Sequence, residues 1–180
     1  MFCLVVDRDI KLCLLEVRHA DALFALVEAN RVYLREWLPW LDANTSAADT
    51  HNFIKSSLDQ FANNNGFQAG IFFRDQLVGM IGYHQTDWAH RSVSVGYWLA
   101  EAVQGQGIMT KACRFLVDYA FAELKLNRVE IRCATGNHKS RAIPERLGFK
   151  LEGTVRQAEW LYDHFVDHTV YGLLASEWPR

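Results

Sequence analysis

Apolar and polar positions along the first third of the chain predict one strand followed by two helices. Residues 11–17 are typical of a strand, and apolar side chains recur at helical spacing over about residues 18–33 and again over about 47–61. The second helix is predicted to end at the turn-forming run 63–66. The aromatic and apolar bend at residues 37–42, interrupted by a proline, lies between the two helices. We expect this bend to be buried packing rather than the wall of a substrate site.

The remaining two thirds predict a meander and then a crossover. Three short β-rich runs, at 67–75, 76–85 and 92–100, follow one another with short connections, which is typical of antiparallel strands. Residues 107–124 are apolar on nearly every side, as in a helix buried against a sheet, and residues 128–134 alternate as a strand. Strand, long helix and strand predict a parallel pair with a right-handed connection.

A short helix near residues 140–147, stopped by Gly148, and two strands around a turn at 162–164 complete the order. The prediction is an α+β fold with a central, mixed, mostly antiparallel twisted sheet of about seven strands, about four flanking helices and one parallel βαβ crossover. Three prolines and no low-complexity tract leave no interdomain linker. We therefore expect residues 1–180 to form a single domain.

Composition narrows the class of partner. Half of the residues are hydrophobic, and the formal net charge of −2 gives no electrostatic reason to expect nucleic acid or an anionic membrane as a partner. No apolar run approaches the roughly 20 residues that cross a bilayer, and the N-terminus lacks the cationic start of a signal peptide. We expect a soluble, cytoplasmic protein, in which surface aromatics allow a homodimer.

The four cysteines, Cys3, Cys13, Cys113 and Cys133, are scattered without close pairs. This spacing suggests neither a zinc ribbon nor a disulfide framework. We expect reduced thiols, as in a cytosolic protein.

A pair of glycines between a strand and a helix carries the clearest chemistry. In "GYWLAEAVQGQGIMTKAC", residues 96–113, Gly105 and Gly107 permit positive φ and close backbone approach, and the following helix aims its unpaired N–H groups at whatever lies above the turn. Such a turn suits a phosphate. A dinucleotide fingerprint would need a glycine where Thr110 stands, and the Gly-Lys-Ser/Thr end of a P-loop is absent. A merely glycine-rich loop is the alternative.

This stretch, followed by "NRVEIRCATGNHKSRAIPERLGFKLEGTVRQAEW", resembles the GNAT superfamily of acyl-CoA-dependent N-acetyltransferases, and within it the RimJ/RimL branch that acetylates protein N-termini, ribosomal proteins among them. The resemblance extends over about residues 10–178. It implies a GNAT fold and acetyl-CoA as cofactor, with turn amides on the pyrophosphate. Met109 stands where the family motif has a small residue, although its amide is available whatever the side chain.

The cofactor residues that the resemblance implies lie on the third meander strand, the glycine turn and the next motif. They are Tyr97, Trp98, Leu99, Gln104, Gly105, Gln106, Gly107, Ile108, Met109, Thr110, Asn137, Lys139 and Ser140. Lys111 and Arg114 could add local positive charge, although solvated surface cations are the alternative.

The motif "GNHKSRAIPERLGF" offers a residue near the sulfur of the cofactor. The resemblance implies that Asn137 lies near the pantetheine arm and that Ser140 lies close to the sulfur, where it could protonate the leaving thiolate. A serine at a helix start is also a common N-cap, which is the competing interpretation. Pro144 lacks the N–H that would bond the carbonyl of Ser140, and we expect that carbonyl to be free for a ligand or water.

The resemblance also implies that Glu159, in "RQAEWLYD", is the general base, whereas residue chemistry alone would favour a solvated carboxylate on a strand. His164 and His168 have a metal spacing only on a helix, and we expect a strand there with no third ligand and no metal. No serine or cysteine follows a nucleophile pattern, so a bound amine is expected to attack acetyl-CoA directly.

An α-amine titrates near about 7.7 to 8.0 and lysine near about 10.4, so an N-terminal α-amine is the easier acceptor. Together with the resemblance, this makes an N-acetyltransferase of a protein N-terminus, such as that of a ribosomal protein, the leading hypothesis. A small-amine acetyltransferase, for polyamines, amino acids or aminoglycosides, is the alternative enzyme. A non-catalytic acetyl-CoA sensor is the alternative of another class.

Overall fold

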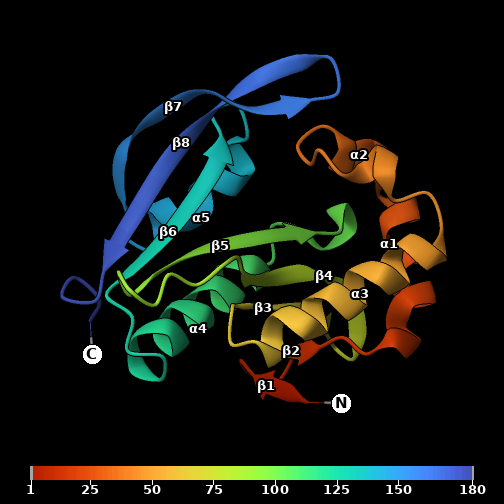
Figure 1. Ribbon diagram of the computed structural model, residues 1–180, viewed down its shortest axis with the longest axis horizontal. Coiled ribbons are helices and arrows are strands. Elements are labelled where there is room, and N and C mark those ends of the chain that lie inside the picture. Colours follow the sequence, from red (N-terminus) through yellow and green to blue (C-terminus); the bar gives the residue numbers. More distant parts are fainter. Residues whose placement is uncertain (1, 180) are drawn as a thin grey trace.

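The computed structural model describes residues 2–179, and its eight described strands form one sheet in the order β1-β2-β3-β4-β5-β6-β8-β7 (Figure 1). The strands are β1 (Cys3–Val5), β2 (Ile10–Leu14), β3 (Phe67–Phe73), β4 (Gln76–Tyr83), β5 (Ser92–Leu99), β6 (Arg128–Ala134), β7 (Lys150–Leu161) and β8 (His164–Leu174). The helices are α1 (Ala20–Ala29), α2 (Arg31–Arg35), α3 (Ala47–Ala62), α4 (Ile108–Ala122) and α5 (His138–Arg146). Among the described helices, none is long and apolar enough to cross a membrane.

The predicted mixed, mostly antiparallel α+β fold is confirmed, with β5 and β6 as its parallel pair. Two details differ from the prediction. A short first strand, β1, adds an eighth strand to the sheet. The helix expected over residues 18–33 is divided, because Asn30 leaves the helical conformation (φ −120°, ψ 9°) between α1 and α2.

The prediction of four free thiols is wrong for one pair, since Cys3 and Cys13 form a disulfide. The register of the β1–β2 hairpin sets these two residues directly opposite each other, with Cα atoms 4.0 Å apart. The sequence pattern did not predict β1, so it gave no reason to bring the pair together. Cys113 and Cys133 are free and buried.

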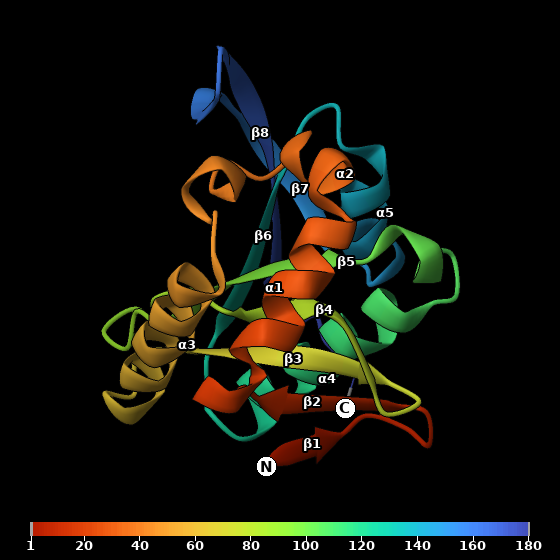
Figure 2. The same cartoon turned by 90° about the vertical axis from the view of Figure 1, so that its right-hand side faces the viewer.

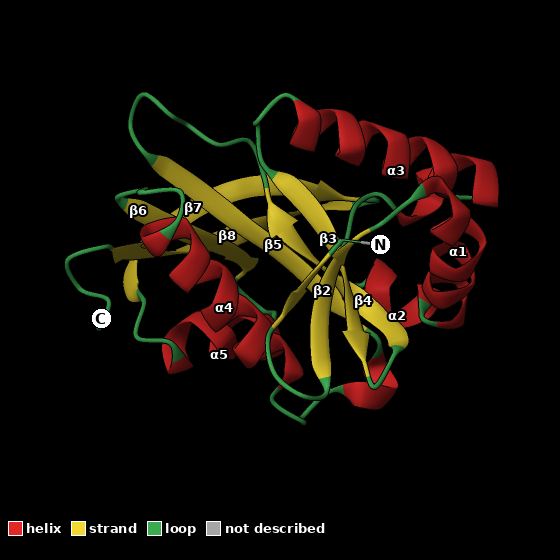
Figure 3. Ribbon diagram, turned by 90° about the horizontal axis from the view of Figure 1, so that it is seen from below, coloured by secondary structure: helices red, strands yellow, loops and turns green. Residues whose placement is uncertain are grey.

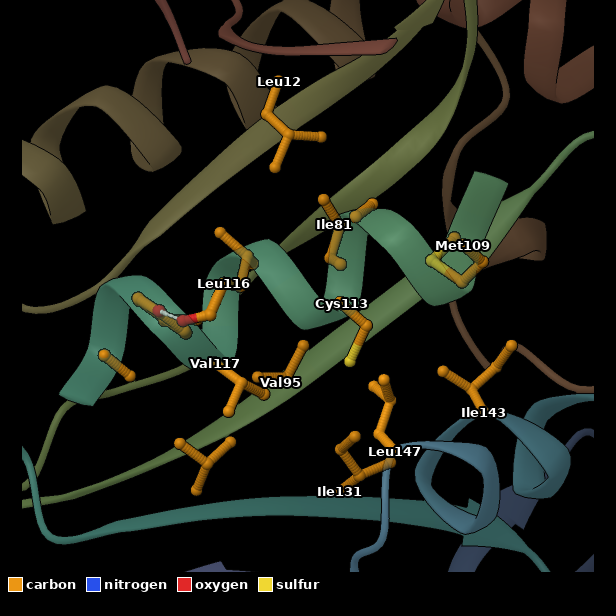
Figure 4. Close-up of a cluster of buried hydrophobic side chains, with 14 of the residues drawn as sticks. Leu12, Ile81, Val95, Met109, Cys113, Leu116, Val117, Ile131, Ile143 and Leu147 are labelled. Carbon is orange, nitrogen blue, oxygen red and sulfur yellow. Dashed lines mark hydrogen bonds between the residues drawn. The ribbon is translucent and has the colours of Figure 1, made fainter. Parts of the chain in front are cut away.

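Helices cover the sheet on both faces, with α1 and α3 side by side on one face and α4 and α5 on the other (Figures 2 and 3). The larger core lies under α4, whose Cys113, Leu116 and Val117 are fully buried against strand residues such as Ile81 and Ile131 (Figure 4). Because α4 is the crossover helix, this packing fixes where its N-terminus meets the sheet.

The parallel strands β5 and β6 pair only along their first residues, Ser92–Ser94 with Arg128–Glu130. Beyond this point they diverge, while β5 keeps pairing with β4 as far as Leu99 (Figure 1). The sheet is therefore split along its middle, and one edge of β5 has no neighbouring strand.

Backbone alternation sets which amides of β5 point into the split. The backbone of β5 bonds β4 through its even-numbered residues, as in the 3.0 Å bond from His84 N to Ser94 O. In an antiparallel pair the intervening residues turn their N–H groups to the other edge. The amides of Val95, Tyr97 and Leu99 therefore face the split.

Candidate functional site

A cleft of about 900 Å³ lies at the split, between the end of β5, the start of α4 and one side of α5. Every predicted cofactor residue except Gln106 lines it. Those that do are Tyr97, Trp98, Leu99, Gln104, Gly105, Gly107, Ile108, Met109, Thr110, Asn137, Lys139 and Ser140. Gln106 is exposed beside them. The structure thus brings together residues that lie more than forty positions apart in the chain, and their contact with a cofactor stays a prediction.

The glycine turn has the geometry that an anion site needs. Gly105 (φ 75°) and Gly107 (φ 76°) both take the left-handed conformation, and Gly107 is the N-cap of α4 without a side chain to accept a hydrogen bond. The first N–H groups of α4, those of Ile108, Met109 and Thr110, have no carbonyl acceptor within the helix, because the helix begins at Ile108. A Cβ at either glycine would meet no protein atom within 4 Å apart from its chain neighbours, so the space beside this part of the cleft lining is open.

Three cations line the cleft beside this turn. Lys139 Nζ donates to Gln104 Oε1 at 3.1 Å, and Arg146 Nη1 donates to Thr110 Oγ1 at 2.7 Å. The third is Lys111, which pairs with the Asp7 carboxylate. Sequence reasoning missed Arg146, because it lies at the far end of α5 and reaches the turn only through the tertiary fold.

Arg114, the other cation that the sequence offered, lies elsewhere. Its guanidinium sits 5.1 Å from the ring centroid of Trp178 and does not line the cleft. It lies one helical turn further along α4 than Lys111.

The structure corrects two expectations about Ser140. The N-cap of α5 is Asn137, whose Oδ1 accepts from Ser140 N at 3.1 Å, so Ser140 lies in the first turn rather than at the cap. The carbonyl of Ser140 is also not free, because the Tyr97 hydroxyl donates to it at 2.9 Å. Burial raises the pKa of the Tyr97 phenol well above its usual value, so the hydroxyl stays protonated and remains a donor. Pro144 does leave this carbonyl without its helical partner, but Tyr97 takes the place expected for a ligand.

A second cavity, of about 750 Å³, adjoins the cleft. Six residues line both hollows, so the two meet where β5 faces the start of α5. The shared residues are Trp37, Leu38, Tyr97, Trp98, Asn137 and Ser140. A group attached at the end of the cleft near Ser140 would therefore face the second cavity.

The bend at residues 37–42 forms one wall of the second cavity, against the expectation of buried packing. Only Leu41 is buried, whereas Trp37, Leu38 and Trp40 are half-buried and line the cavity. Tyr162, in the β7–β8 turn, holds the bend in place, since its hydroxyl donates to the carbonyl of Leu38. The sequence could not predict this contact, which joins residues more than 120 positions apart.

Glu159 on β7 and His168 on β8 also line the second cavity. Glu159 Oε2 and His168 Nε2 are 3.3 Å apart, and the two side chains are 28% and 17% exposed. The sequence singled out His168 only for its spacing from His164, which instead contacts Asp163. Within residues 2–179, no group of three or more His, Cys, Asp or Glu side chains could hold a metal ion.

Cys133 lies at the junction of the two hollows, where its Sγ is 3.2 Å from Ser140 Oγ. Burial raises the pKa of the Cys133 thiol, and the protonated thiol is a weak nucleophile. The junction therefore offers a hydroxyl and a thiol as weak donors rather than an activated protein nucleophile. This favours direct transfer between two bound molecules.

Comparison with known proteins agrees with this geometry. Residues 10–150 match the family model described as an acetyltransferase (GNAT) domain. YdaF of Bacillus subtilis (strain 168), provisionally named as a ribosomal N-acetyltransferase, is 42% identical over 180 residues, covering 99% of this chain and 98% of that protein. The ribosomal-protein-serine acetyltransferase of Escherichia coli (strain K12) is 30% identical over 166 residues, covering 92% and 93%. The solved structure of RimL, a ribosomal L7/L12 α-N-protein acetyltransferase in complex with coenzyme A, has a TM-score of 0.91 at 27% identity, covering 96% of this chain and 98% of that one.

Proposed function

Because the chain belongs to the GNAT acetyltransferase family, with ribosomal-protein acetyltransferases among its relatives, we propose that it acetylates the α-amino group of a protein N-terminus, such as that of a ribosomal protein. The family transfers acetyl groups from acetyl-CoA to amines, and this chain is an acetyl-CoA-dependent N-acetyltransferase. The observation that carries the proposal is the second cavity, which meets the cofactor cleft at Ser140 and holds Glu159 in its wall.

The residues of the cleft fit a diphosphate. Two left-handed glycines leave space where a side chain would stand, the unpaired amides of α4 point out of the turn, and Lys139 and Arg146 add positive charge. We assign the glycine turn to the pyrophosphate and the split edge of β5 to the pantetheine arm.

Bound acetyl-CoA supplies the acetyl group as a thioester. The acceptor amine loses a proton as its nitrogen bonds to the carbonyl carbon, and Glu159 takes this proton, directly or through water. A β5 amide that faces the split, among those of Val95, Tyr97 and Leu99, donates to the carbonyl oxygen as it gains charge. The Ser140 hydroxyl donates to the departing sulfur.

The acceptor cavity favours an α-amine over a polycation. Its lining includes two carboxylates, Asp49 and Glu159, and one arginine, Arg132, which leaves little net negative charge. The Asp49 carboxylate already accepts hydrogen bonds from Ser46 and Thr45 at the start of α3. Several unpaired carboxylates would be expected for a polyamine or aminoglycoside acceptor.

Labelled acetyl-CoA tests the proposed acceptor. We expect a peptide with a free N-terminus to be acetylated with a kcat/KM at least about tenfold above that of the same peptide with a blocked N-terminus and one lysine, because far less of the lysine is uncharged at pH 7. Product mass spectrometry locates the acetyl group. Preferred transfer to spermidine or an aminoglycoside would support the small-amine alternative. Stabilisation by acetyl-CoA without transfer to any amine would support the sensor.

Arg146 provides a test of the phosphate end of the cleft. We expect Arg146→Ala to weaken coenzyme A binding by about three- to tenfold, and by more at low salt, because an exposed cation acts on phosphate through a screened interaction. Arg114→Ala is the matched control, since it removes the same charge from outside the cleft. Calorimetric titrations at two salt concentrations measure both. If Arg146→Ala and Arg114→Ala weaken coenzyme A binding equally, the affinity depends on the net charge of the protein and not on the position of Arg146 in the cleft.

Three broader assignments accompany this function. The pairing of all eight described strands into one sheet supports a single acyltransferase domain over residues 1–180. The proposed ribosomal acceptor implies a cytoplasmic location. The Cys3–Cys13 disulfide is an argument against this location, because thiols in the cytoplasm are kept reduced. A homodimer stays a prediction, and the exposed aromatic side chains of Trp160 and Phe165 could form part of its interface. Light scattering measures the mass of the protein in solution and so tests this prediction.

A further inference from the structure

The hairpin of β7 and β8 has an irregular register beside the second cavity. Val155 lies opposite His168, and Glu159 lies opposite Val166, so that residues 156–158 of β7 face Asp167 alone. Without this bulge, Glu159 would lie opposite His164, four residues or about 13 Å along the strand from His168. The two extra residues bring Glu159 to the diagonal neighbour position of His168, within side-chain reach.

Specific contacts hold the bulge. Gln157 has a φ of 49°, a conformation that costs a non-glycine residue about 1–2 kcal/mol. Its amide donates to Asp167 Oδ1 at 2.8 Å. The carbonyl of Asp167 in turn accepts from Thr135 N at 2.9 Å, which ties the bulge to the loop after β6. Backbone strain held in place by its surroundings occurs often at functional sites.

The bulge gives Glu159 a histidine as its partner. Among the basic side chains of residues 2–179, only the His168 imidazole lies within 4 Å of the Glu159 carboxylate, whereas the nearby Arg132 pairs with Glu130. A permanent cation beside Glu159 would favour its ionised form and make it a weaker base. A neutral imidazole with its proton on Nε2 can instead donate to Oε2 and orient the carboxyl group without adding a charge.

We propose that His168 is a positioning residue that holds Oε2 of Glu159 and leaves Oε1 facing the acceptor amine. This inference rests on the proposed function, because it assigns Glu159 the role of base. The register of the hairpin makes this role possible. The bulge sets the distance between Glu159 and His168, and the hydrogen bond from His168 sets the orientation of the Glu159 carboxyl group. His168 itself exchanges no proton with the acceptor.

A double-mutant cycle tests this role, with acetylation of an N-terminal peptide as the assay. We expect His168→Leu to lower kcat about tenfold, with the KM for acetyl-CoA unchanged, because a misplaced catalytic group costs rate rather than cofactor binding. His168→Gln, which keeps a donor, should recover most of the rate. In a Glu159→Gln background the His168→Leu change should have no further effect, since coupled residues are not additive.

His164→Leu is the matched control, because His164 is on the same strand and face and contacts only Asp163 among its described ion pairs. Coenzyme A titration and near-ultraviolet circular dichroism check that each variant is folded, and His168→Asn replaces His168→Leu if the latter is not. Full activity of the His168 variant, or an equal loss in both backgrounds, would overturn the proposal. If the wild-type protein itself acetylates no α-amine, the proposed function is wrong. This outcome is distinguishable from failure of the His168 proposal, in which the wild-type protein is active and the His168 variant is equally active or loses equal activity in both backgrounds.

Discussion

Replacement of Glu159 by glutamine is expected to lower kcat for peptide acetylation by about 10²- to 10³-fold, within the range that general bases contribute. Glutamine keeps the size of the side chain and loses the ability to take a proton at neutral pH. Glu159 lines the acceptor cavity and not the cofactor cleft, so the dissociation constant of acetyl-CoA should stay within about twofold, or about 0.4 kcal/mol. Steady-state kinetics and calorimetry measure the two quantities separately.

Glu152→Gln is the control for this variant, since Glu152 stands on the same strand, lines neither cavity and pairs with Arg128. The Glu152→Gln substitution should leave kcat unchanged. If Glu159→Gln turns over at the wild-type rate near neutral pH, Glu159 is only a solvated carboxylate of β7. The amine would then lose its proton to solvent. His168 would have no base to position, so its proposed role would be excluded as well.

Local sequence signals were reliable where the physical cause is local. The left-handed glycines and the helix that follows them were predicted because few residues besides glycine adopt positive φ and because the α4 segment is rich in apolar residues, seven of which are buried. The β6 strand, Arg128–Ala134, has the predicted bounds, and its burial alternates from Arg128 to Cys133. Each of these features depends on a residue and its immediate neighbours.

Errors arose where distant segments meet. The carbonyl of Ser140 lacks its helical donor, as Pro144 predicted, but the donor that replaces it is a hydroxyl from β5. Arg146 and His168 reach the site through helix packing and a strand bulge, neither of which has a pattern in the sequence. The roles of residues in a site composed of several elements follow from register and packing, which sequence periodicity does not specify.

The glycine turn gives the second large expectation: Gly107→Val should weaken coenzyme A binding by about 100-fold, or about 2.7 kcal/mol. Gly107 sits at φ 76°, where a β-branched residue is strained, so the turn is expected to relax and rotate the first amides of α4 away from the diphosphate. The added side chain would also occupy open space beside the cleft that Gly107 lines, because no protein atom other than its chain neighbours lies within 4 Å of the Cβ position. Calorimetric titration of coenzyme A into the folded variant measures the loss.

Gly148→Val separates this effect from general instability. Gly148 has nearly the same φ, 79°, equally open space around its Cβ position and a place beside a helix end, but it lines neither cavity. Both substitutions should therefore cost similar stability, about 1–3 kcal/mol of strain, and lower the melting temperature alike. Only the Gly107 variant should lose coenzyme A. A Gly107 variant that binds normally would mean that main-chain amides of this turn do not hold the diphosphate, because a binding site made of backbone cannot survive a change in backbone conformation.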